Sequence, residues 1–235
     1  MNDVVVLLVV LMALVVIAAD LLIRRRMARR AKPPATVKAA IMDLLIPSLQ
    51  VERFHLPGGL FFSRGHTWAN LLFSGQIKVG MDDFLQRLVG RIDDIGLPPM
   101  GAEVKQGGPF VTIRQGGRTV TLPAPVDGVV CAVNEELTRS PILVKRDPYT
   151  RGWLVALQPT NLGSNLFGLM VGEGAREWLK AEVARFQTFV SSALTEQQDV
   201  LLGPTAADGG LHADGLLEHL NDDAWCRFRR EFVEG

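Results

Sequence analysis

The side chains that most often carry out chemistry are few in this chain, and they do not fall at the spacings of a catalytic or metal site. The four histidines are His55, His66, His212 and His219. None belongs to an HxxxH, HExxH or Cys/His ligand pattern, so we expect no metal site. The sequence has no Gly-x-Ser-x-Gly motif and no nucleophile–base pair that can be named. The segment Gln106-Gly107-Gly108-Pro109 lacks the Lys-Ser/Thr of a phosphate loop. We therefore predict no enzymatic activity and no bound cofactor.

A tight hairpin is the clearest local element of the sequence. Gly116-Gly117 is a pair suited to the positive φ angles of a two-residue turn. With the turn placed there, Ile113 faces Val120 and Val111 faces Leu122, so the apolar residues share one face. A slip of one residue would break this pairing, so the register is specified. The sequence predicts an antiparallel hairpin with a Gly-Gly pair at an exposed tip.

Several short motifs lie around this hairpin in a characteristic order. They are Pro125-Val126-Asp127-Gly128, Val133-Asn134-Glu135-Glu136-Leu137, Ser140-Pro141, Asp147-Pro148-Tyr149 and Gly152-Trp153-Leu154, with His66-Thr67-Trp68, Gly80 and Leu97-Pro98 upstream. In order and spacing this set resembles the glycine cleavage system H protein, a lipoyl carrier, whose corresponding early motif is His-Glu-Trp. The resemblance covers about half of the chain.

The resemblance implies a lipoyl-type barrel-sandwich hybrid of antiparallel strands. Strand patterns at 129–133, 143–144 and 153–157 agree with it. Helices are predicted over 37–46 and 216–232, and an amphipathic helix over 173–194. We expect an α+β protein that begins with a single N-terminal transmembrane helix and ends with additional C-terminal helices. The predicted parts are a transmembrane helix at 1–23, a basic juxtamembrane linker at 24–36, a short helix and connecting segment at 37–59, an H-protein-like domain at 60–180 and a C-terminal helical extension at 181–235.

The resemblance also implies a lipoylated lysine at the hairpin tip, eight positions before Pro125. This chain has Gly117 there. Glycine offers no amine for a lipoyl amide, and the Arg118 guanidinium stays protonated and is a poor acyl acceptor. Lys105 and Lys145 lie outside the tip. We therefore expect no lipoyl group, and we predict a protein interaction surface instead, made of Arg114, Gln115, Gly116, Gly117 and Arg118.

A long apolar run lies near the start of the chain. Val4–Ala19 and Leu21–Ile23, with Asp20 between them, make about 20 residues, enough for a helix to cross a bilayer. Positive charge follows the run, which predicts that the rest of the chain is cytoplasmic and that the basic residues lie next to the membrane. We expect a single-pass protein of the inner membrane; the alternative is a buried helix with a solvated basic end. The membrane-proximal basic residues are Arg24, Arg25, Arg26, Arg29 and Arg30.

Composition excludes one class of partner. Lys and Arg together number 25, as do Asp and Glu, so the formal net charge is zero. Nucleic-acid-binding domains are usually basic, so we expect no nucleic-acid partner. Cys131 and Cys226 are far apart and have no CxxC partner, which predicts reduced thiols.

Two functional hypotheses follow from these features. In the first, the chain is a pseudo-carrier: a non-catalytic, membrane-anchored module that binds a protein partner at the cytoplasmic face, as an accessory subunit of a membrane complex. In the second, it is a lipoyl-type carrier in glycine cleavage or related redox chemistry, with an unusual modification site. A transport adaptor is a third possibility, which the arginines after the span and the lack of long heptad runs disfavour. The hairpin tip favours the first hypothesis.

Overall fold

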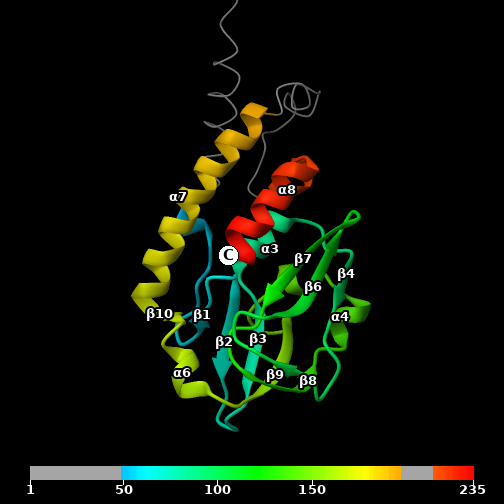
Figure 1. Ribbon diagram of the computed structural model, residues 1–235, viewed down its shortest axis with the longest axis vertical. Helices are drawn as coiled ribbons and strands as arrows, with labels where there is room; N and C mark the ends of the chain where they lie inside the picture. Colours follow the sequence, from blue (N-terminus) through cyan, green and yellow to red (C-terminus); the bar gives the residue numbers. More distant parts are fainter. Residues whose placement is uncertain (1–48, 197–213) are drawn as a thin grey trace, which may run out of the picture. The chain divides into compact units, whose positions relative to one another are not determined.

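The computed structural model describes residues 49–196 and 214–235 (Figure 1). The predicted span at 1–23, the linker arginines and the short helix expected over 37–46 lie outside the described residues. Within the described part, the chain forms two antiparallel sheets with helices packed against them. This confirms the α+β class and the antiparallel arrangement.

The larger sheet has seven strands in the order β10-β1-β2-β3-β9-β8-β5 within the described part. Every pair of neighbours in it is antiparallel. Both edge strands are only two residues long, which limits the unpaired backbone at each edge. The strands are β1 (Phe61–Phe62), β2 (Thr67–Leu71), β3 (Ile77–Met81), β5 (Glu103–Val104), β8 (Gly128–Val133), β9 (Trp153–Pro159) and β10 (Met170–Val171).

The smaller sheet contains the predicted hairpin. It is built from β4 (Asp94–Gly96), β6 (Pro109–Gln115) and β7 (Arg118–Pro123), in the order β4-β6-β7. Ile113 pairs with Val120 and Val111 with Leu122, as predicted. All four of these side chains are buried. The register is therefore confirmed, and with it the position of the Gly-Gly turn.

Most helices also follow the sequence pattern. α7 (Gly172–Glu196) contains the predicted amphipathic helix, and α3 (Asp83–Val89) buries Phe84, Leu85 and Leu88. The boundary predicted at residue 180 falls inside α7, so the C-terminal extension begins partway along a continuous helix. The shorter helices are η2 (Val51–Arg53), α4 (Glu136–Arg139), α5 (Leu143–Arg146) and α6 (Leu162–Leu166).

Two expectations about the backbone differ from the structure. The single helix predicted over 216–232 is instead three short pieces: η4 (Leu216–His219), α8 (Asp222–Phe228) and the π-helical η5 (Arg229–Val233). Asn221 breaks the helix because its side chain caps α8 by accepting from the Ala224 N–H. The strand expected at 143–144 is helix α5, since both residues lie on one helical turn facing the core. Within residues 49–196 and 214–235, no helix has both the length and the apolar content needed to cross a bilayer.

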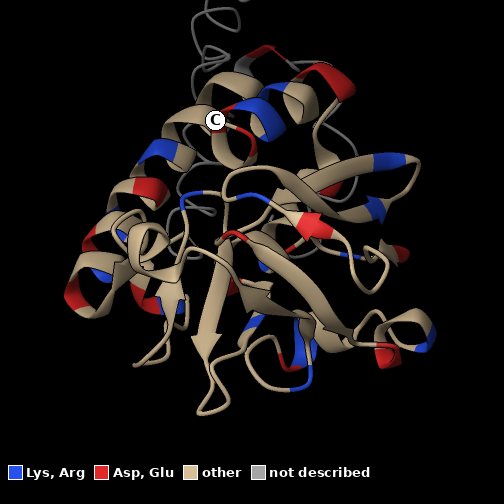
Figure 2. Cartoon of the chain, turned by 60° about the horizontal axis from the view of Figure 1, so that its bottom comes forward, with Lys and Arg blue, Asp and Glu red and all other residues tan. Residues whose placement is uncertain are grey.

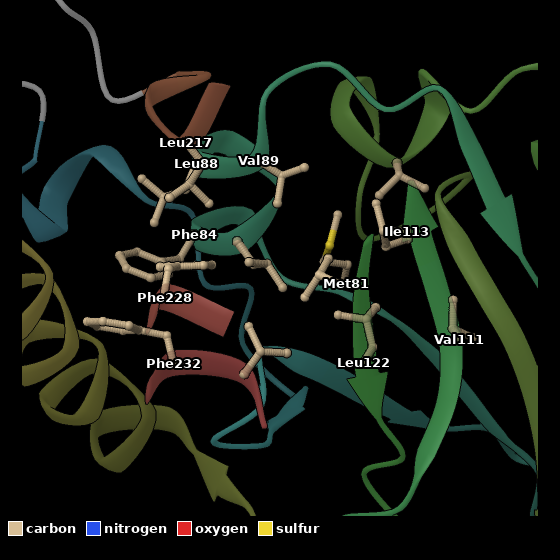
Figure 3. Packing of buried hydrophobic residues seen from close by; sticks show 14 of the residues in the cluster. Met81, Phe84, Leu88, Val89, Val111, Ile113, Leu122, Leu217, Phe228 and Phe232 are labelled. Atoms are coloured by element: carbon tan, nitrogen blue, oxygen red, sulfur yellow. The ribbon is translucent and has the colours of Figure 1, made fainter. Parts of the chain in front are cut away.

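One hydrophobic core joins the sheets to the C-terminal segment, which we define as residues 214–235. Figure 3 shows Phe228 and Phe232 on one side of this core and the hairpin side chains Ile113 and Leu122 on the other, with Met81 between them. Phe228 and Phe232 stack with ring centroids 5.2 Å apart, and both rings also contact Phe186 of α7. The C-terminal segment therefore completes the core and lies beside α7 (Figure 1).

Candidate functional site

The hairpin tip is an open turn of two glycines. Gly116 and Gly117 have φ angles of 52° and 84°, both in the left-handed region that glycine adopts without strain. A Cβ added to either residue would meet nothing within 4 Å among the described atoms. The turn therefore needs glycine for its backbone conformation, and not because neighbouring atoms crowd it.

Gln115 fixes the base of the tip to the body of the protein. Its side chain is buried, and its Nε2 donates to the carbonyl of Val89 at the end of α3. On the other side of the strand end, the Gly116 N–H donates to Asp93 Oδ2 at 2.6 Å. This hydrogen bond holds the pKa of Asp93 below its usual range. Gln115 consequently points inward and is not part of the exposed surface.

Arg118 joins the tip to the C-terminal segment. Its Nε donates to Asp222 Oδ1 at 2.9 Å, and its two terminal nitrogens donate to the carbonyls of Leu217 at 3.1 Å and Leu220 at 2.7 Å. The guanidinium also lies 5.5 Å from the centre of the Trp225 ring. The side chain is only 22% exposed. Most of its donors are therefore used within the molecule.

Arg114 is the arginine of the tip that remains on the surface. Its side chain is 56% exposed and forms an ion pair with Asp94 of β4. Of the five residues in the predicted interaction surface, Arg114, Gly116 and Gly117 are exposed. The structure brings all five together at one end of the hairpin, and their role in binding stays a prediction.

A hollow of about 490 Å³ lies beside the tip. Arg91, Glu218 and Asp222 complete its walls, and the sequence analysis did not identify them. Glu218 accepts a hydrogen bond from the Arg91 N–H at 2.5 Å. Because Asp222 lies 104 residues from its partner Arg118 in the sequence, no local spacing signals the contact. Figure 2 shows Lys/Arg and Asp/Glu segments interspersed over the described elements, in line with the balanced charge.

A second polar cluster is buried under α7. His66 has a φ of 60°. Its Nδ1 forms a hydrogen bond with Asp82 Oδ2 at 2.8 Å, and its Nε2 lies 3.5 Å from Glu182 Oε1. Its ring lies between Phe84 and Trp178, with centroids 4.8 and 5.2 Å away. Burial alone would lower the pKa of His66, but the two carboxylates raise it to about 9. The three side chains are buried and tie α7 to the sheet, so we assign the cluster a structural role.

Comparisons with known proteins fit this geometry. The model of the glycine cleavage H-protein family matches residues 60–182. Probable glycine cleavage system H proteins of Pyrococcus abyssi and Thermococcus kodakarensis are each 35% identical to the chain over 133 residues, covering 57% of this chain and 98% of the relative. The H protein of Mycolicibacterium smegmatis is 36% identical over 123 residues, covering 52% of this chain and 94% of that protein. A crystal structure of an H protein from Mycobacterium marinum aligns with a TM-score of 0.46 at 24% identity, covering 50% of this chain and 94% of that one.

The localisation predicted from the N-terminal run is wrong in light of these findings. The chain matches proteins named as glycine cleavage H proteins over nearly their whole length. The error has a physical origin: an apolar run of that length satisfies the requirement for a membrane span and also that for a buried helix. Hydropathy alone therefore does not separate the two.

The match extends well beyond the tip, to both sheets, to the His66 cluster and to the first half of α7. The C-terminal segment, which accepts hydrogen bonds from Arg118, lies outside the matched residues. The family model covers more than half of the chain, and the archaeal relatives are covered almost completely. The chain belongs to the glycine cleavage H-protein family.

Proposed function

We propose that this chain is a pseudo-carrier of the H-protein family, which docks onto a protein partner through its hairpin tip without carrying a lipoyl group. The observation behind the proposal is the chemistry of the tip. Its two central residues are glycines, and the residue that follows is an arginine already committed to the C-terminal segment. We assign no catalytic step to the module.

The tip does not fit a lipoyl group, for reasons of bonding and not of space. Attachment requires a lysine ε-amine, whereas Gly117 has no side chain although a Cβ would be unobstructed there. Arg114 and Arg118 are the nearest basic residues, and their guanidinium groups remain protonated and poorly nucleophilic. We therefore derive no reaction step through a lipoyl arm.

The carrier hypothesis remains the second candidate, and the comparisons favour it over an accessory role because all the relatives reported above are named as H proteins. Lys105 is the described lysine that best suits it. Lys105 is exposed at the start of a turn in which the Gly108 N–H donates to the Lys105 carbonyl at 2.8 Å. This turn lies at the opposite end of β6 from the Gly-Gly tip, so a lipoyl arm there would leave from another part of the domain.

The exposed part of the tip offers a rigid contact for a protein partner. Gln115 and Arg118 anchor the two strands, so little conformational freedom is left for the turn to lose on binding. The exposed guanidinium of Arg114 can leave its ion pair with Asp94 and pair instead with an acidic group of a partner. Proteins of the glycine cleavage system are the proposed partners, since the family acts with them.

Binding of the full chain to purified glycine cleavage enzymes of its own host tests the proposal. We expect saturable binding that Arg114→Glu weakens by about tenfold, because the exposed cation at the contact is reversed. Arg176→Glu on α7 is the matched control, since that arginine is also exposed and has only an i,i+3 acidic neighbour. Equal affinity of both variants would place the contact elsewhere, and no binding to any of the enzymes would contradict the proposal.

A further inference from the structure

A polar cavity of about 730 Å³ lies apart from the hairpin tip. Its walls come from residues 55–60, from α3, and from α5 with the loop that follows it. The walls are tied together: Tyr149 donates to the His55 carbonyl at 2.6 Å and accepts from the Asp83 N–H at 2.9 Å. The volume falls within the range of small-molecule sites, which are usually preformed clefts.

The acidic side chains of this cavity already have partners. Asp83 accepts hydrogen bonds from Arg87 at 3.1 Å, from the His55 N–H at 2.8 Å and from Gln86 at 2.5 Å. Asp147 accepts from Thr150, and Asp214 lies 3.7 Å from Arg87. The carboxylates consequently leave few open positions for a cationic ligand.

Two groups in the cavity wall make no hydrogen bond with a described residue. The Lys145 amine has no hydrogen bond or ion pair with any described residue, although its side chain is partly buried. Gln86 is only 3% exposed, and its Oε1 has no hydrogen-bond partner in the described part of the chain. The unpaired acceptor of the buried Gln86 costs free energy, which a suitable donor on a ligand would recover. The Lys145 amine is partly open to solvent and is therefore free to meet an anion.

The unpaired amine selects for an anion. Burial lowers the pKa of Lys145, and Arg87 adds to that effect while Asp214 and Glu218 offset part of it. A carboxylate at Lys145 would favour its charged ammonium form, and the neighbouring Arg146 adds a second cation without a described partner. A hydroxyl or amino group on the same molecule would supply the donor that Gln86 lacks.

We propose that this cavity binds a small carboxylate that also carries a hydroxyl or amino group, with Lys145 holding the carboxylate and Gln86 accepting the donor. The inference is independent of the docking function assigned to the tip. It concerns different residues, and it holds whether or not the chain is lipoylated.

Titration of the full-length protein with three small probes tests the inference, monitored by amide chemical shifts and calorimetry. Lactate has the carboxylate and the hydroxyl, propionate has only the carboxylate, and 1,2-propanediol has only hydroxyls. We expect saturable binding of lactate, weaker binding of propionate and none of the diol. The ¹³Cε resonance of Lys145 should report a higher pKa when lactate is bound, because the bound anion favours the charged amine.

Two variants distinguish lactate binding in this cavity from a general effect of added salt. Lys145→Met keeps the apolar stem and should weaken lactate binding about tenfold or more, as expected on removing a charged hydrogen-bond partner. Lys180→Met, at an exposed position of α7, should leave binding unchanged. If Lys145→Met does not fold, Lys145→Gln takes its place. Absence of saturation by about 50 mM lactate, wild-type affinity in the Lys145 variant, or equal affinity for lactate and propionate would each overturn the proposal.

Discussion

At the scale of single residues, two positions define what the hairpin tip can do. Gly117 stands where the family resemblance places a lysine, so the tip lacks the amine that acylation requires. Arg118 next to it is turned inward to the C-terminal segment by three hydrogen bonds. Arg118 therefore fastens the tip to the C-terminal segment, and the tip itself offers no amine for a lipoyl arm.

Replacing Arg118 should reveal how firmly the tip is fastened. Arg118→Ala removes the hydrogen bonds to the Leu217 and Leu220 carbonyls and to Asp222. We therefore expect the free energy of unfolding to fall by about 2 kcal/mol. Arg114→Ala, which breaks one exposed ion pair, should change it by less than about 1 kcal/mol. Urea denaturation of both variants makes the comparison; equal losses would show that the contacts of Arg118 do not fasten the tip.

His66 makes the stability of the fold depend on pH. Its pKa is raised in the folded protein from 6.5 to about 9 by Asp82 and Glu182, despite its burial. A raised pKa contributes stability that is complete below pH 6.5 and is lost as the pH rises through about 9. We expect a loss on the order of 3 kcal/mol across this window.

Measuring the free energy of unfolding from pH 6 to pH 10 tests whether stability falls as the pH rises. The comparison is His66→Asn, because asparagine tolerates the positive φ of 60° and does not titrate in this range. The part of the pH dependence due to His66 should be missing in the variant, whatever its absolute stability. Stability that rises with pH in the wild type, or equal slopes in both proteins, would contradict the assignment.

At the scale of elements, the hairpin and α7 could be predicted because short-range patterns determine them. Alternating apolar residues and a Gly-Gly pair specify the register of β6 and β7, and a 3.6-residue stripe specifies α7. The pieces η4, α8 and η5 share one apolar stripe, which favoured a single long helix. The cap at Asn221 and the contact of Arg118 with Asp222 depend on tertiary packing, which the local sequence does not encode.

The C-terminal segment should be essential to the core although it lies outside the family match. Phe228 is fully buried between α7 and the hairpin, so Phe228→Ala should lower the free energy of unfolding by about 3–5 kcal/mol. Phe73 is the matched control, because its ring is fully exposed at the turn between β2 and β3. Phe73→Ala should change stability by less than about 0.5 kcal/mol. A small effect of Phe228→Ala in thermal unfolding would mean that the segment packs loosely.

At the scale of the whole molecule, an H-protein domain is followed by a C-terminal segment that packs on its hairpin. The family match supplies both sheets and part of α7, and the additional residues occupy the space beside the tip. The missing acceptor amine and the fastened tip are the basis of the docking proposal. The relatives reported above, all named as H proteins, favour the carrier hypothesis instead.

The intact mass of the full chain, purified from its own host, tests this account most directly. Peptide mapping should follow, so that any added group is assigned to a residue, and a lipoylated H protein serves as the positive control. We predict the unmodified mass, because the tip presents Gly116 and Gly117 and no lysine. A lipoyl mass increment on any lysine, at Lys105 or elsewhere, would contradict the pseudo-carrier account and establish a carrier with a displaced attachment site.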